Sequence, residues 1–173
     1  MDKPVFKRKI YDEIYEWKEN RSDKYALLIK GARRVGKSTI AEEFAKKEFK
    51  SYILIDFAHT SKAIKYLVSD GRYKYIETGS LLSIKKNTKD ILIPSEEHKI
   101  SMFPMDFEEF LWAIGDEVSA ETIRYLIKNK KAAGNAMHRN LMRIFRLYML
   151  VGGMPQSIET YIFIRQQVVK DVE

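Results

Sequence analysis

Nine consecutive residues, Gly31 to Thr39, read GARRVGKST and combine glycines, a lysine and hydroxyls at a spacing that suits phosphate binding. They match the pattern G-x-x-x-x-G-K-[ST], in which the two glycines let the backbone approach an anion closely. The backbone N–H groups between them point inward and lead into a helix N-terminus, where anions bind favourably. The spacing therefore predicts a phosphate-binding loop.

The last three residues of this loop suit the parts of a nucleoside triphosphate. Lys37 is expected to reach the β and γ phosphates, and the Ser38 hydroxyl to bind the Mg²⁺ that bridges them. Thr39 is expected to contact the α phosphate. We predict ATP and Mg²⁺ binding by the whole loop, whose variable positions are Ala32, Arg33, Arg34 and Val35. The side chains of the two arginines are expected to be exposed or packing groups rather than catalytic ones.

The segments around the loop have the hydrophobic patterns that its position requires. Residues 25–30 (YALLIK) are an apolar run typical of a strand buried in a parallel sheet, and residues 37–49 have a helical pattern. Further strands are predicted at residues 51–57 (SYILIDF), 72–82 and 99–103 (KISMF). The pattern predicts an α/β fold of the P-loop NTPase type, a three-layer sandwich built on a parallel sheet.

Residues outside this core are predicted to be helical. Ile10, Ile14 and Trp17 form one apolar stripe of an N-terminal helix. After Pro104, Asp106 and Glu109 have the spacing of a capping box that starts a helix. We therefore divide the chain into an N-terminal helix (1–24), a P-loop core (25–104) and a helical, lid-like region (105–173).

Thr78 lies near the end of a predicted strand, in the sequence Thr-Gly-Ser. We expect this strand beside the loop strand, so that a hydroxyl can bond the γ phosphate or the attacking water. Thr78 and Lys37 are therefore the candidate catalytic residues. The alternative is a strand-to-helix turn capped by Ser80, and the sequence favours neither.

An ATPase of this type needs an apolar strand that ends in Asp-Glu, in which the Asp holds the Mg²⁺ shell and the Glu polarises water. The sequence contains no segment with this pattern. Asp56 is followed by phenylalanine, and Glu77 precedes the Thr-Gly-Ser sequence. Asp106 and Glu109 belong to the capping box, and Asp116 follows a glycine in a loop between helices. No pair of acids is assigned to catalysis from the sequence.

Four stretches together resemble a family of bacterial and archaeal predicted ATPases of the AAA+ class: LLIKGARRVGKST, YIETGSLLS, FPMDFEEFL and YMLVGGMP. The resemblance covers most of residues 8–160. It implies an N-terminal ATPase domain, a helical region and an uncharacterised C-terminal domain that this sequence does not include.

The resemblance also implies an acidic strand between residues 51–57 and the Thr78 strand, where this chain has only the short link AHTSK before the next similar segment. We hypothesise a missing segment near residues 60–63. The family's Gly-Arg pair, which could act across a subunit interface, is replaced here by PSEEHK. Candidates for a lid arginine are Arg139, Arg143 and Arg146, whose alternative is a solvated helix face.

The composition sets wider limits. The chain has 173 residues, no cysteine and a net charge of +7, so a disulfide framework and a thiolate metal site are excluded. No apolar run is long enough for a membrane helix, and we expect a cytoplasmic protein with no membrane partner. The basic charge leaves a nucleic-acid partner open beside a protein partner, and the oligomeric state is open too.

We predict an ATPase that hydrolyses ATP with Mg²⁺ and is coupled to a partner. The alternatives are a P-loop kinase acting on a small acceptor and a nucleotide-gated nucleic-acid or protein binding module with little turnover.

Overall fold

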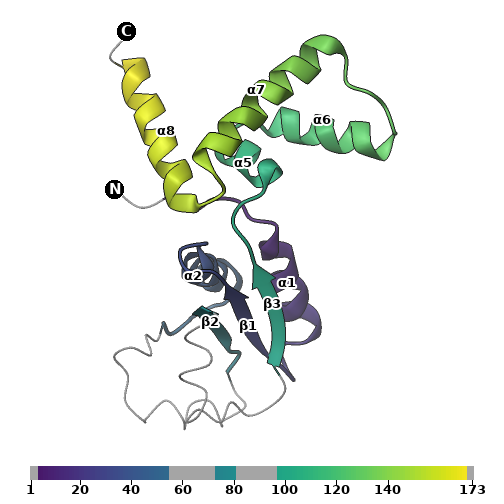
Figure 1. The fold of residues 1–173 in the computed structure, drawn as a ribbon. Helices are drawn as coiled ribbons and strands as arrows, with labels where there is room; N and C mark the ends of the chain where they lie inside the picture. Colours follow the sequence, from purple (N-terminus) through teal and green to yellow (C-terminus); the bar gives the residue numbers. More distant parts are fainter. Residues whose placement is uncertain (1–3, 55–72, 81–96, 171–173) are drawn as a thin grey trace. The chain divides into compact units, whose positions relative to one another are not determined.

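The computed structural model describes residues 4–54, 73–80 and 97–170 (Figure 1). Its internal contacts divide the chain into two units, one formed by residues 9–103 and the other by residues 104–173 together with residues 1–8. We call the first the core unit and the second the helical unit. The predicted boundaries at residues 24 and 104 remain predictions.

The core unit contains a three-stranded sheet in the order β2-β1-β3, formed by β1 (Ala26–Gly31), β2 (Ile76–Ser80) and β3 (Glu97–Met102). Both neighbours pair with β1 in parallel. Leu27, Leu28 and Ile29 are all buried, so β1 is apolar on both faces as a central parallel strand must be. The predicted α/β fold with a parallel sheet is confirmed.

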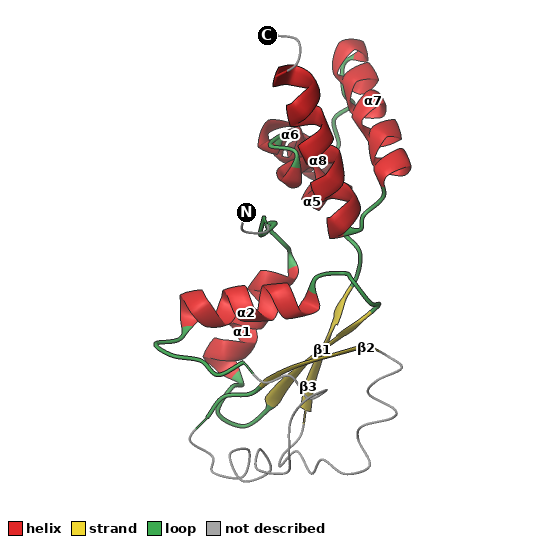
Figure 2. Cartoon of the chain, turned by 90° about the vertical axis from the view of Figure 1, so that its left-hand side faces the viewer, coloured by secondary structure: helices red, strands yellow, loops and turns green. Residues whose placement is uncertain are grey.

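Helices α1 (Ile10–Asn20) and α2 (Lys37–Glu48) lie on the same face of this sheet (Figure 2). The predicted apolar stripe of α1 is buried. The Tyr11 ring packs edge to face against the Phe44 ring of α2, with 5.1 Å between the ring centroids. No described helix covers the other face of the sheet, so the third layer of the predicted sandwich remains a prediction.

The predicted strand at residues 51–57 is wrong as far as the structure describes it. Residues 51–54 form no strand, and Ile53 and Leu54 are 71% and 67% exposed. An apolar run becomes a strand only where a neighbour pairs with its backbone, and within the described residues β2 pairs with β1 alone. The hypothesised missing segment near residues 60–63 lies outside the described residues.

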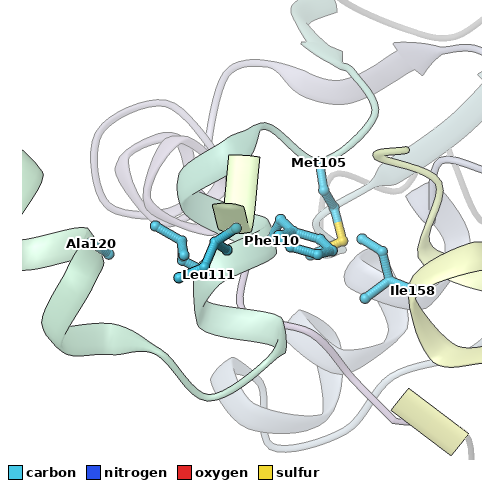
Figure 3. Packing of buried hydrophobic residues seen from close by; sticks show 6 residues of the cluster. Met105, Phe110, Leu111, Ala120 and Ile158 are labelled. Carbon is cyan, nitrogen blue, oxygen red and sulfur yellow. The ribbon is translucent and has the colours of Figure 1, made fainter. Parts of the chain in front are cut away.

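The helical unit contains α5 (Phe107–Ala113), α6 (Glu117–Lys128), α7 (Asn135–Val151) and α8 (Pro155–Lys170). Its core joins residues from α5, α6, α7 and α8 with the chain just before α5 (Figure 3), and the cluster consists of Met105, Phe110, Leu111, Ala120, Ile144 and Ile158. Helix α8 lies within the region 105–173 that was predicted to be helical, although the sequence analysis assigned it no bounds of its own.

Backbone contacts close this unit at the turn between α7 and α8. Gly152 ends α7 with φ of 78°, and the Met105 N–H donates to the Gly153 carbonyl at 2.7 Å. The Tyr148 hydroxyl donates to the Met105 carbonyl at 2.9 Å. A Cβ on Gly153 would lie 2.2 Å from that same carbonyl oxygen, so only glycine fits there. Across the described segments, no helix combines the length and the apolar character needed to cross a membrane.

Candidate functional site

The loop begins where β1 ends, at Gly31. A Cβ there would lie 2.2 Å from the Met102 carbonyl oxygen on the neighbouring strand β3, a distance that real side chains do not reach. Glycine is therefore required because two backbones pack together. The sequence analysis assigned Gly31 to turning the backbone and approaching the phosphates, and it missed the main chain of Met102 as the neighbour that requires glycine.

The second motif glycine, Gly36, starts α2 from the left-handed region, with φ of 97°. This conformation favours glycine and turns the chain from the loop into the helix. No side chain caps the helix, and its first turn contains no acidic residue. Among the described residues no side chain therefore accepts from the N–H groups at this end of α2, and the helix dipole favours an anion there.

Lys37, the first residue of α2, is buried, with 8% of its surface exposed. Its Nζ donates to the carbonyl oxygens of Ala32 at 2.6 Å and Gly31 at 3.1 Å. Burial lowers the pKa of this amine from its ordinary value of 10.5. The lysine is thus held across the loop by backbone acceptors, with its charge in a partly desolvated place that an anion would stabilise.

Ser38 and Thr78 meet although they are 40 residues apart in the chain, with their hydroxyl oxygens 3.2 Å from each other. The parallel pairing of β2 with β1 places Thr78 opposite Ile29, which confirms the predicted neighbourhood of the Thr78 strand and the loop strand. Thr78, Gly79 and Ser80 pair with the last residues of β1, so they belong to the strand and form no turn.

The remaining loop residues have different environments. Val35 is fully buried and anchors the loop in the core, whereas Arg33, Arg34 and Thr39 are exposed. Arg34 has φ of 66°, so the loop turns sharply before Val35. Arg33 and Arg34 were expected to be either exposed or packing groups, and the structure shows that both are exposed.

The carboxylates that the sequence excluded from catalysis have structural partners. The Asp106 carboxylate accepts from the Glu109 N–H at 2.9 Å, and the Glu109 carboxylate accepts from the Asp106 N–H at 3.2 Å, which confirms the capping box. Asp116 caps α6 by accepting from the Ser119 N–H at 3.1 Å. Within residues 4–54, 73–80 and 97–170, no group of three or more His, Asp or Glu side chains is arranged to hold a metal ion.

Fold and loop together define the class of this protein: a parallel α/β sheet with the architecture of a P-loop NTPase, accompanied by a helical region. A family model described as an AAA domain matches residues 23–63, which span β1, the loop and α2. This match supports an AAA-type, nucleotide-binding ATPase domain in the core unit. Neither a curated protein nor a solved structure matched the chain.

Proposed function

We propose that the protein binds ATP with Mg²⁺ at the loop from Gly31 to Thr39 and hydrolyses it. The observation that carries this proposal is the contact between Ser38 and Thr78 beside the uncapped start of α2. A loop built only as a turn needs no hydroxyl from a second strand at this place.

The described residues fit a magnesium-bound triphosphate. Gly36 leaves the backbone open at the helix start, and Lys37 supplies a positive charge within the loop. The exposed Ser38 hydroxyl is an oxygen ligand of the type that Mg²⁺ takes. Bound Mg²⁺ would neutralise charge on the phosphates during transfer.

Each residue then has a stated task. Lys37 exchanges its bonds to the loop carbonyls for bonds to phosphate, Ser38 orients the metal, and Thr78 holds the Ser38 hydroxyl or donates to the reacting group. The hydroxyls of Thr78 and Ser38 are too weakly basic near neutral pH to take a proton from water, so another residue must be the base.

We further propose that this base belongs to an acidic strand beside β2, on the side away from β1. A segment that the natural chain has near residues 60–63, and that the present sequence lacks, would contribute this strand. Support comes from the resemblance described above, from the exposed apolar residues Ile53 and Leu54, and from the family match, which ends at residue 63. Intact mass of the protein made from its own gene tests this. A mass fully explained by the present sequence through Ser61 and Lys62 would leave a nucleotide binder with weak hydrolysis.

The main test replaces Lys37. Because hydrogen bonds to charged groups contribute about 1.5–3 kcal/mol, Lys37→Ala should weaken binding of a labelled ATP analogue by about 10- to 100-fold. The control is Lys47→Ala on the same helix, an exposed lysine paired with Glu43. Equal affinities for both variants would contradict the proposal.

Release of free phosphate from ATP without any added acceptor separates hydrolysis from the kinase alternative. Phosphate release that requires a small acceptor molecule would favour a kinase.

A further inference from the structure

The charge of this protein is concentrated in one stretch of the chain. Residues 122–158 contain seven of the 31 Lys and Arg residues and none of the 24 Asp and Glu residues. The rest of the chain therefore has 24 charges of each sign and is neutral, and the whole net charge of +7 lies in this stretch. A lysine-rich surface of ordinary composition would mix both signs.

The stretch runs from within α6 through α7 to the start of α8, and its cations lie on α6, on α7 and on the link that joins these two helices in Figure 1. All seven cationic side chains are exposed, and they are Arg124, Lys128, Lys130, Lys131, Arg139, Arg143 and Arg146. We call these seven residues the basic hairpin. Arg124 contacts the Glu108 carboxylate, and Lys131 bonds the Tyr125 hydroxyl at 3.3 Å. Within the described residues, no carboxylate pairs with the other six.

The arginines of α7 form a row and no pocket. Arg139, Arg143 and Arg146 are spaced by four and three residues, which places them on one face at intervals of about 6 and 4.5 Å along the helix. A row of cations suits a polymer with repeated negative charge, whereas a single phosphate or carboxylate is bound by converging groups.

The opposite face of α7 is already used by the core. Ile144 is buried, the Phe145 ring meets the Phe107 ring at 5.1 Å, and Tyr148 bonds the Met105 carbonyl. A helix that lies in a membrane surface inserts its apolar face between the lipids. The core occupies this stripe of α7, whereas Met149 and Leu150 of the same helix are 61% and 86% exposed. The choice of a water-soluble polyanion therefore rests on the row of cations, and vesicles in the experiment below test a lipid surface.

We propose that the basic hairpin binds the phosphate backbone of a nucleic acid. Phosphate contacts from Lys and Arg provide affinity without sequence preference, and they release counterions, so binding weakens steeply with salt. None of its residues belongs to the loop, but Arg139, Arg143 and Arg146 are also the candidate lid arginines, a role that remains a prediction; binding of nucleic acid is therefore measured without nucleotide. The proposal identifies the part of the chain that would carry a nucleic-acid partner.

Fluorescence anisotropy of labelled duplex DNA and single-stranded RNA, without nucleotide, tests the proposal. Arg139→Gln/Arg143→Gln should weaken binding at least about tenfold at low salt and make the slope of log K against log salt shallower by about 2. Glutamine is nearly as good a helix former as arginine, so α7 should be retained, and circular dichroism checks this.

The matched control removes two cations elsewhere. Lys46→Gln/Lys47→Gln on α2 lowers the net charge equally, but both lysines pair with glutamates of the same helix. Its affinity should change less than twofold. Equal losses in both double variants would assign the binding to net charge and overturn the proposal.

Two further measurements separate this proposal from its alternatives. Lys37→Ala should bind the nucleic acids like the parent even if it no longer binds ATP, which separates this proposal from the proposed ATPase function. Vesicles rich in phosphatidylserine and poly-glutamate are the competing polyanions. Stronger binding of the parent to either of them than to DNA and RNA would overturn the assignment to nucleic acid.

Discussion

Two helices of this protein begin in opposite ways. Helix α5 is closed at its N-terminus by its own side chains, because Asp106 and Glu109 bond each other's backbone N–H groups. Helix α2 begins at Gly36 without a side-chain cap and without an acid in its first turn. The first four N–H groups of a helix lack partners within the helix, so α5 satisfies some of them itself and α2 does not.

An uncapped start alone does not mark a binding site, because α7 also begins at a glycine without a side-chain cap or an acid in its first turn. What distinguishes α2 is the buried Lys37 in its first turn. At α5 the carboxylates also fix the fold, since the Glu109 carboxylate lies 3.2 Å from the Arg8 guanidinium in a nearly buried pair. The first turn of α2 contains a cation instead of a carboxylate. This cation is Lys37, whose amine donates to two backbone carbonyls of the loop. A capped start stabilises the protein alone, whereas an open start beside a buried lysine is stabilised when an anion binds.

The largest expected effect comes from opening the closed end. Glu109→Ala removes half of the capping box and leaves Arg8 buried without this partner, which should cost about 3–5 kcal/mol of unfolding free energy in the helical unit. Urea unfolding followed by Trp112 fluorescence, in a Trp17→Phe background, measures it. Glu109→Gln keeps the capping geometry and isolates the charge. A loss below about 1 kcal/mol for Glu109→Ala would show that the pair contributes little.

At the open end, the loss should appear in function and leave stability nearly unchanged. Thr78→Val keeps the β-branched shape that a strand accepts, but it removes the hydroxyl that meets Ser38. Turnover of ATP should fall at least tenfold, since removing a donor aimed at developing charge typically costs about 10²–10³ in kcat. Thr78→Ser keeps a hydroxyl and should retain most of the rate. A Thr78→Val protein that melts lower yet hydrolyses ATP at the parental rate would make Thr78 a purely structural residue.

Adding a carboxylate to the open end should make α2 resemble α5. Thr39 is exposed in the first turn of α2, so Thr39→Glu places a negative charge near the positive end of the helix dipole. Without nucleotide, stability should rise by about 0.3–1 kcal/mol. Affinity for ATP should fall about tenfold, because the new charge repels the phosphates. Thr39→Gln is the uncharged control, and a parallel rise of stability and affinity would contradict the open-end interpretation.

The sequence predicted the elements whose residues determine their own local structure. The glycines and Lys37 predicted the loop, and three consecutive apolar residues predicted β1. The spacing of Asp106 and Glu109 predicted the start of α5. Placing Thr78 beside the loop strand also succeeded, because the fold class fixes which strands are neighbours.

Other features depend on partners that the sequence does not reveal. Residues 51–54 have the composition of a strand, but pairing decides whether such a run becomes one. The bonds of Lys37 to Ala32 and Gly31 follow from the closed shape of the loop, and the clash that requires Gly31 comes from Met102, 71 residues later in the chain. The basic hairpin was not predicted, because its cations form no continuous run and the stretch differs from the rest of the chain by its lack of acids.

The smallest expected effect concerns protons at Lys37. Burial lowers the pKa of its amine below 10.5 in the folded protein, so between the two pKa values the unfolded chain binds more protons, and stability without nucleotide should rise with pH there. Bound phosphate favours the charged amine and raises its pKa again. ATP binding should therefore take up a fraction of a proton at alkaline pH, and affinity should fall as pH rises above the lowered pKa, by at most about tenfold per pH unit. Calorimetry of ATP binding in two buffers of different ionisation enthalpy measures the uptake, with the same titration near neutral pH as the reference. Binding enthalpies that give no more proton uptake at alkaline pH than at the reference would mean that phosphate does not approach this lysine.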